Sequence, residues 1–178
     1  MPAGGAATFR GLAYDAKFSF TNFNTVTSTN LLSKLVQNAG VGARVHTNSW
    51  GNDGTTSYIA WTQAVDQFSF ENEDNLVCFA VTNLNAAIKT PENAKNCLAV
   101  AATQDTPNQG SFCSGGTWYT NDQRRKPEVM APGCGTVSAS GSGTSGQRSR
   151  MEVGCSVRCR SIFSAIVPPG NGRRPVGI

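Results

Sequence analysis

The chain has 178 residues and a formal net charge of +4 at neutral pH, and this length suffices for one compact domain with its own core. Residues 1–145 hold nine basic and ten acidic side chains, whereas residues 146–178 hold six arginines and one glutamate. Because the net basicity lies in the last segment, the composition argues against nucleic-acid binding by the body of the protein.

The first part of the chain predicts a strand followed by a helix. Residues 16–21 alternate phenylalanines with smaller or polar side chains, which is typical of a strand. The next segment has an apolar stripe at helical spacing, with Ser28 or Thr29 available as a cap and Gly40 near its end. The stripe consists of Leu31, Leu32, Leu35 and Val36.

Strand and helix patterns continue to alternate up to residue 102. Trp61, Val65 and Phe68 recur at the spacing of a second helix, and three further segments have the apolar character of strands. The predicted elements are strands at residues 43–48, 76–81 and 97–102, a helix at residues 57–72 and a turn at residues 51–54.

Continuous apolar strands that alternate with amphipathic helices indicate a sheet buried on both faces. We therefore predict an α/β fold of three layers, with a doubly wound, mostly parallel sheet and right-handed crossovers. In such sheets, functional residues gather where strands end at the carboxyl edge, which is where residues 48–51 and 82–83 fall. After residue 103 the sequence predicts mainly loops, and the serine- and glycine-rich residues 138–149 can equally be a linker.

The six cysteines are widely spaced and indicate no metal site. They form no Cys-x-x-Cys pair and have no histidine cluster beside them, which argues against zinc. Cys78 and Cys97 lie in apolar runs, where a free cysteine usually behaves as a small buried hydrophobic residue. Disulfides are possible, but the sequence assigns no pairing.

A glycine-flanked serine, Ser145, is the candidate nucleophile. A serine nucleophile needs a base that takes its proton and donors that hold the oxyanion. The single histidine, His46, lies within the predicted strand at residues 43–48. That position is more typical of a packed or hydrogen-bonded histidine than of a general base.

Several segments in a fixed order resemble the subtilisin-like serine peptidases, the subtilases. The resemblance covers residues 10–145, and its most specific part is the KPEVMAPG motif followed by Gly-Thr-Ser. The segments are GLAYDAK (11–17), ARVHTNSWG (43–51), FAVTN (79–83), PENAKN (91–96), RKPEVMAPG (125–133) and SGTS (142–145).

The resemblance implies roles for individual residues. Ser145 matches the family's nucleophile, and Asn83 matches the asparagine whose side-chain amide completes the oxyanion hole. Ser49, Trp50 and Gly51 match the extended segment that pairs with the substrate backbone and borders the pocket for the side chain before the scissile bond. The resemblance thus implies a serine endopeptidase with a peptide or protein substrate. We expect no cofactor and assign no metal-binding residues, and the sequence leaves calcium binding open.

The sequence departs from the family pattern in three places. The family's catalytic aspartate and histidine precede the segment at residues 11–17, and Asp15 and His46 match neither position. Thr82 stands where the family usually has glycine, and we expect its branched side chain to distort the turn that aims Asn83. After Ser145 the family continues with an apolar helix, which residues 146–150 do not supply.

We therefore expect a partial subtilisin-like domain over residues 1–145, incomplete at the N-terminus and after the nucleophile. Residues 146–178 would be a basic tail, disordered or aberrant, and the chain by itself would be inactive. The alternative is a non-catalytic, peptide-binding remnant of a subtilase. Nucleic-acid binding by the tail is disfavoured because Phe163 is its only aromatic residue.

The remaining expectations concern the location and assembly of the protein. Members of the family are often secreted, but the first ten residues lack the apolar stretch of a secretory signal. No apolar run reaches the length of about 18 residues that a membrane span needs. We expect a monomer.

Overall fold

The computed structural model describes residues 16–84, 86–104, 107–115, 119–134, 136–139, 148–151 and 161–166. The elements in chain order are β1 (Lys17–Asn22), the 3-10 turn η1 (Phe23–Thr25), α2 (Leu31–Gly40), β2 (Val45–Asn48), α3 (Ala60–Glu71), β3 (Leu76–Ala80), β4 (Leu98–Thr103), β5 (Phe112–Ser114), β6 (Val129–Pro132), β7 (Thr136–Ala139), β8 (Arg148–Met151) and β9 (Ser161–Ile166).

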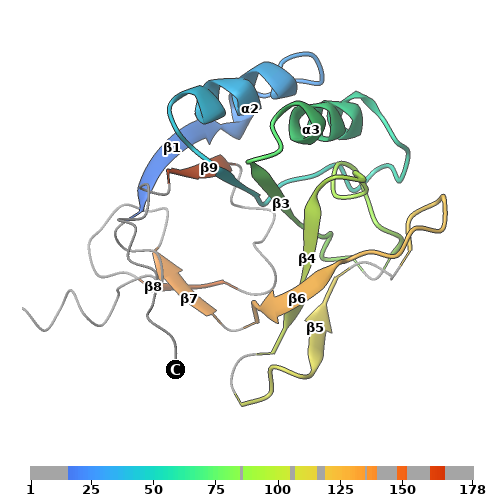
Figure 1. The fold of residues 1–178 in the computed structure, drawn as a ribbon. Coiled ribbons are helices and arrows are strands. Elements are labelled where there is room, and N and C mark those ends of the chain that lie inside the picture. Colours follow the sequence, from blue (N-terminus) through green and yellow to red (C-terminus); the bar gives the residue numbers. More distant parts are fainter. Residues whose placement is uncertain are drawn as a thin grey trace, which may run out of the picture.

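Seven of these strands form one sheet with a parallel centre (Figure 1). Its order is β1-β9-β2-β3-β4-β5, and β6 also pairs with β4. The pairs β2–β3, β3–β4 and β4–β6 are parallel, whereas β9 runs antiparallel to both β1 and β2. The predicted mostly parallel α/β fold is confirmed, and β7 and β8 form a separate two-stranded sheet.

Helices α2 and α3 pack against each other on the same side of the sheet (Figure 1). This arrangement follows from the chain order, because successive right-handed crossovers in one direction place their helices on one face. The core between helices and sheet is apolar, and its central side chains are at most 1% exposed. They are Leu31, Leu35, Val65, Phe68, Val77 and Phe79.

Helix α2 differs from the prediction in its cap and in the width of its apolar face. Asn30, rather than Ser28 or Thr29, is the N-cap residue, and its side chain bonds backward to backbone atoms of Thr25 and Thr27. Val36 is 46% exposed, so it lies outside the buried stripe.

Strand β6 lies in a region where the sequence predicted mainly loops. Its residues are exposed, and parallel pairing with β4 holds the strand in place. In this pairing Val129 lies beside Val100, and Pro132 lies beside Thr103. Buried Lys126, just before β6, donates a hydrogen bond to the Cys97 carbonyl and pairs with Glu128. Contacts with a distant strand, rather than local apolar spacing, therefore define this element.

The cysteines in the described part adopt two roles. Cys113 and Cys134 form a disulfide that joins β5 to the end of β6, a pairing that the sequence did not assign. Cys97 is free and buried, as predicted, and burial raises the pKa of its thiol to about 12. Cys78 is also free but only partly buried.

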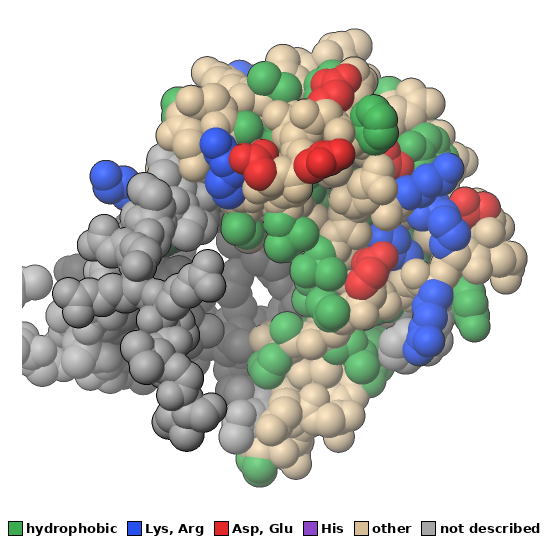
Figure 2. Space-filling model, viewed as in Figure 1, with side chains coloured by type: hydrophobic (Ala, Val, Ile, Leu, Met, Phe, Trp, Pro, Cys, Tyr) green, Lys and Arg blue, Asp and Glu red, His purple; other side chains and the backbone are tan. Residues whose placement is uncertain are grey.

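The surface charges of the described part are mixed. On the face that Figure 2 shows, acidic and basic side chains lie beside one another in several places. Two ion pairs with partly exposed partners, Arg44–Asp74 and Arg124–Asp122, contribute to this mixing. Within the described ranges, no helix is both long and apolar enough to cross a membrane.

Candidate functional site

A pocket of about 280 Å³ lies where β2 and β3 end. Because these strands are parallel, their carboxyl ends meet at one edge of the sheet. The segment after β2 forms one wall of the pocket, and the segment after β3 forms another. The lining residues are Phe23, Ser49, Trp50, Gly51, Asp53, Ala80, Val81, Thr82, Asn83 and Glu92.

Four of the five residues expected at the site line this pocket. Ser49, Trp50 and Gly51 come from the first wall and Asn83 from the second, more than thirty residues later in the chain. The structure therefore brings the expected substrate-pairing segment and the expected oxyanion asparagine together. The fifth residue, Ser145, lies outside the described residues.

Aromatic packing fixes the first wall. Trp50 is 7% exposed, and its ring lies 4.8 Å from the Phe23 ring and 5.3 Å from the Phe79 ring, centroid to centroid. Its indole Nε1 donates a hydrogen bond of 3.1 Å to Asn48 Oδ1. This bond satisfies the polar atom of a buried tryptophan and sets the orientation of its ring.

Thr82 joins the two walls. Its hydroxyl donates to Asp53 Oδ1 at 2.6 Å and accepts from the Leu84 amide at 3.2 Å. Its backbone amide donates to Glu92 Oε1 at 3.1 Å. The sequence predicted that the branched side chain of Thr82 would distort the turn that aims Asn83. In the structure, the Thr82 hydroxyl forms two hydrogen bonds that a glycine at this position could not make.

Glu92 is the most deeply buried acidic group of the pocket. The residue is 2% exposed, and its Oε1 accepts hydrogen bonds from the backbone amides of Thr82 and Lys89. Burial raises the pKa of its carboxyl group to about 7, and the nearby charge of Asp53 acts in the same direction. None of the ion pairs among the described residues involves Asp53 or Glu92.

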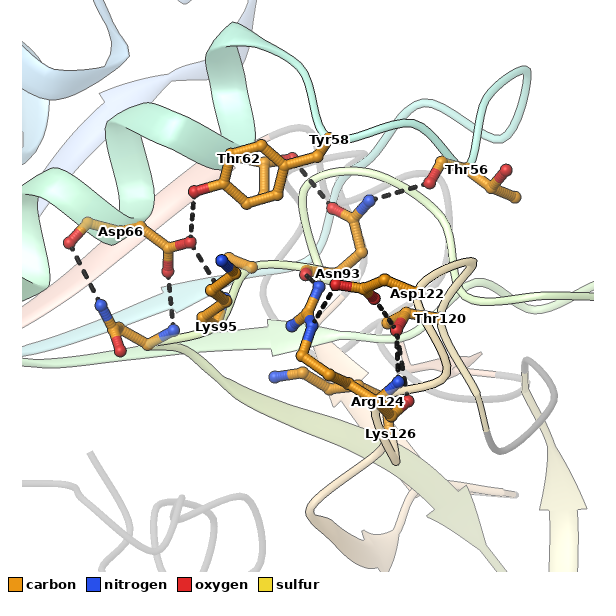
Figure 3. Close-up of polar contacts among 12 residues, drawn as sticks. Thr56, Tyr58, Thr62, Asp66, Asn93, Lys95, Thr120, Asp122, Arg124 and Lys126 are labelled. Carbon is orange, nitrogen blue, oxygen red and sulfur yellow. Dashed lines mark hydrogen bonds and ion pairs between the residues drawn. The ribbon is translucent and has the colours of Figure 1, made fainter.

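The segment that carries Glu92 is anchored by its neighbour Asn93 (Figure 3). The Asn93 side chain accepts from Thr62 Oγ1 at 2.8 Å and donates to the carbonyls of Thr56 and Ser57. Its backbone carbonyl accepts from Arg124 Nη2 at 2.8 Å. These contacts fix the backbone beside Glu92 to helix α3 and to two loops.

Buried Asp66 of α3 anchors the same segment further along (Figure 3). Its carboxylate accepts from the backbone amides of Lys95 and Asn96 at 3.1 and 2.6 Å, and from the Tyr58 hydroxyl at 2.6 Å. Burial and the hydrogen bond to Asp66 raise the pKa of Tyr58 to about 12. The segment that follows Glu92 is thus held by a polar network.

His46 lies away from the pocket, as expected of a structural histidine. It is fully buried in β2, with its Nε2 2.9 Å from Asn75 Oδ1 and its ring edge-to-face with Phe68. Burial lowers the pKa of the imidazole. The expectation that His46 is packed and hydrogen-bonded is confirmed.

Phe23, Asp53 and Glu92 also line the pocket, although the sequence did not predict them there. Asp53 lies in the predicted turn at residues 51–54, and Glu92 lies in the PENAKN segment at residues 91–96. Asp53 follows one predicted strand by five residues and Glu92 precedes another by five, and these positions could have suggested an acidic site beside the sheet. The two acidic residues converge through hydrogen bonds to Thr82, which is 29 residues from Asp53 and 10 residues from Glu92. The spacing of residues along the chain does not reveal such contacts.

Known proteins share this sequence pattern and fold. A family model described as the subtilase family matches residues 2–157. A curated relative, the serine protease/ABC transporter B family protein tagD of Dictyostelium discoideum, is 29% identical over 128 residues. The match covers 65% of this chain but only 7% of that much longer protein.

Two solved structures are similar in fold. The prenylagaramide maturation protease PagA is matched with a TM-score of 0.55 and 24% identity, over 74% of this chain and 45% of that one. The PatG macrocyclase, solved with a peptide, is matched with a TM-score of 0.56 and 20% identity, over 74% of this chain and 38% of that one. Since the family model covers most of the sequence and the sheet matches these neighbours, the chain belongs to the subtilase family and carries a serine protease-type domain.

Proposed function

We propose that this chain carries the substrate-binding part of a serine endopeptidase of subtilisin type. The pocket at the ends of β2 and β3 would receive one side chain of an extended peptide. Residues Ser49 to Gly51 would pair with the peptide backbone as an added strand. No cofactor is needed for this role.

The observation that carries this proposal is the meeting of Ser49, Trp50, Gly51 and Asn83 in one pocket. These residues come from two separate segments that follow parallel strands. A pocket of about 280 Å³ is close to the lower limit for small-molecule sites. Its size therefore suits a single amino-acid side chain better than a large ligand.

Within this proposal, Ser145 is the nucleophile and Asn83 the oxyanion donor. The Asn83 amide would stabilise the charge that develops on the carbonyl oxygen of the scissile bond. We expect none of residues 1–178 to match the family's triad aspartate and histidine, since Asp15 and His46 match neither position. In subtilisin itself, loss of the serine or the histidine lowers turnover by about a millionfold, so we expect no measurable proteolysis by residues 1–178 alone.

A fluorophosphonate probe tests the state of Ser145. Purified protein and its Ser145→Ala variant are incubated with the probe, and labelling is measured by mass spectrometry. We expect equal, background labelling of both proteins. Labelling of the wild type that the substitution abolishes would demonstrate an activated nucleophile and refute the expected inactivity.

The second candidate function is peptide binding without catalysis. The observation in its favour is the position of His46, the single histidine of the sequence, which is buried in β2 away from the pocket. Titration of the folded protein with blocked peptides tests the binding step that both functions share. Lack of saturation at millimolar peptide would reject both.

A further inference from the structure

We propose that the pocket selects a positively charged side chain, lysine or arginine, and that Glu92 and Asp53 determine this specificity. The inference rests on the proposed peptide-binding function and adds the chemical class of the bound residue. It comes from the two carboxylates of the pocket and from the way the fold holds them.

Charge is the first argument. Of the ten residues that line the pocket, two are acidic and none is basic. Elsewhere in the described part, Arg44, Arg124 and Lys126 each pair with an acidic residue other than these two. A pocket of one sign attracts ligands of the opposite sign, more strongly where its walls exclude water.

The burial of Glu92 is the second argument. A carboxyl group that is 2% exposed favours its protonated form, and a cation bound beside it would stabilise the ionised form. Backbone amides supply part of the stabilisation of the ionised form, and those of Thr82 and Lys89 both donate to Oε1. The other oxygen, Oε2, faces the first wall and lies 3.2 Å from where a Cβ atom on Gly51 would be. A cation that enters beside Gly51 would thus meet Oε2.

Thr82 holds the two carboxylates in place. Its hydroxyl donates to Asp53 Oδ1 and its amide to Glu92 Oε1. One oxygen of each acidic group is thus engaged with the same residue, which fixes the positions of both carboxylates in the pocket. A carboxylate pair held in this way does not need to reorganise when a cation binds, which favours affinity.

The apolar walls suit the rest of such a side chain. Phe23, Trp50 and Val81 line the pocket together with the acids. Lysine and arginine bury their methylene stems against apolar surface and keep the charged head near polar groups. An arginine head can also stack on an aromatic face.

The test uses four blocked tripeptide amides of the form acetyl-Ala-Ala-X, in which X is lysine, arginine, norleucine or glutamate. Affinities for the protein of residues 1–178 are measured by calorimetry and by the intrinsic fluorescence of the tryptophans. We expect the lysine or arginine peptide to bind at least about tenfold more tightly than the norleucine peptide, and the glutamate peptide most weakly. The better of the two cationic peptides identifies the preferred head group.

Three variants complete the experiment. Glu92→Gln removes the charge but keeps an oxygen that can accept from the Thr82 and Lys89 amides. Asp53→Asn removes the charge of an exposed residue. The two variants therefore test the two carboxylates separately. Either variant should reduce the ratio of cationic to norleucine affinity to less than about threefold. Glu73→Gln removes the same charge at an exposed position outside the pocket and should leave the ratio unchanged.

The outcomes separate this inference from the proposed function. Equal affinity for the lysine, arginine and norleucine peptides would overturn the charge preference but leave peptide binding intact. A preference that survives in both Glu92→Gln and Asp53→Asn would overturn the assignment to these residues. If no peptide binds, the proposed function and the inference built on it both fail.

Discussion

The hydroxyl of Thr82 donates a 2.6 Å hydrogen bond to Oδ1 of Asp53, 29 residues earlier in the chain. Through this bond the segment after β3 is tied to the turn that follows β2. The same hydroxyl also accepts from the Leu84 amide. The pair therefore couples the second wall of the pocket to an acidic residue of the first.

Replacement of Thr82 by valine should destabilise the protein. Valine keeps the branched shape but leaves Asp53 and the Leu84 amide without this partner, and the free energy of unfolding should fall by about 2 kcal/mol. Urea denaturation measures the change. Thr82→Ser is the control, because it retains the hydroxyl and should lose less than about 1 kcal/mol. Equal losses in both variants would show that the hydrogen bonds contribute little.

The raised pKa of Glu92 predicts a pH dependence of stability. In the folded state its carboxyl group titrates at about 7, against 4.5 for the ordinary group. Between these values the native state keeps a proton that the unfolded state has lost, so stability falls as the pH rises. The free energy of unfolding should decrease by up to about 3 kcal/mol across this range because of Glu92.

Urea unfolding at pH 5 and pH 8 tests this dependence. Other groups titrate in the same interval, so the relevant quantity is the difference between wild type and Glu92→Gln. Relative to the variant, the wild type should lose stability at the higher pH. An unchanged difference at the two pH values would contradict a raised pKa for Glu92.

Asn93 should be a strong contributor to stability. It is 2% exposed, and its side chain exchanges hydrogen bonds with Thr62 and with two loop carbonyls. Asn93→Ala removes all three hydrogen bonds at a buried position, and we expect a loss of about 3 kcal/mol in chemical denaturation. Asn96→Ala is the matched control, because that side chain is exposed and its hydrogen bond to Asp66 is long, at 3.5 Å. Similar losses at the two positions would argue against the anchoring role of Asn93.

Two glycines should respond in opposite directions to replacement by alanine. At Gly51 a Cβ atom would lie 3.1 Å from the Thr90 carbonyl oxygen, which is itself held by a hydrogen bond from Asn52. At Gly40, in the last turn of α2, no atom lies within 4 Å of the added carbon. Gly51→Ala should destabilise by about 1–2 kcal/mol through crowding, and Gly40→Ala should stabilise by about 0.5–1 kcal/mol.

Thermal unfolding of both variants provides the measurement. The melting temperature should fall for Gly51→Ala and rise for Gly40→Ala relative to wild type. An increase at Gly51 would indicate that the segment after β2 can move away from Thr90, and the pocket wall would then be less rigid than the structure implies.

The sequence predicted the regular elements well where local patterns are strong. The helices at α2 and α3 and the strands β2, β3 and β4 were expected close to their observed bounds, because apolar side chains repeat there at helical spacing or form continuous runs. Strand β6 was not expected. Its residues are exposed, and only its pairing with β4 makes it a strand.

The candidate site was predictable in part. Parallel strands end at the same edge of a sheet, so the meeting of residues 49–51 with Asn83 followed from the order of strands and helices. The acidic pair did not follow from it. Asp53 and Glu92 converge only because turns and side-chain hydrogen bonds bring them to Thr82.

The sequence by itself thus determined the alternation of strands and helices, the family to which the motifs belong and the structural role of His46. These features depend on local periodicity, on the order of motifs and on the burial of a strand. Only the tertiary structure decided that Asp53, Thr82 and Glu92 share one pocket and that Cys113 pairs with Cys134. Such contacts join residues that are far apart in the chain, and no local spacing encodes where folding will bring them together.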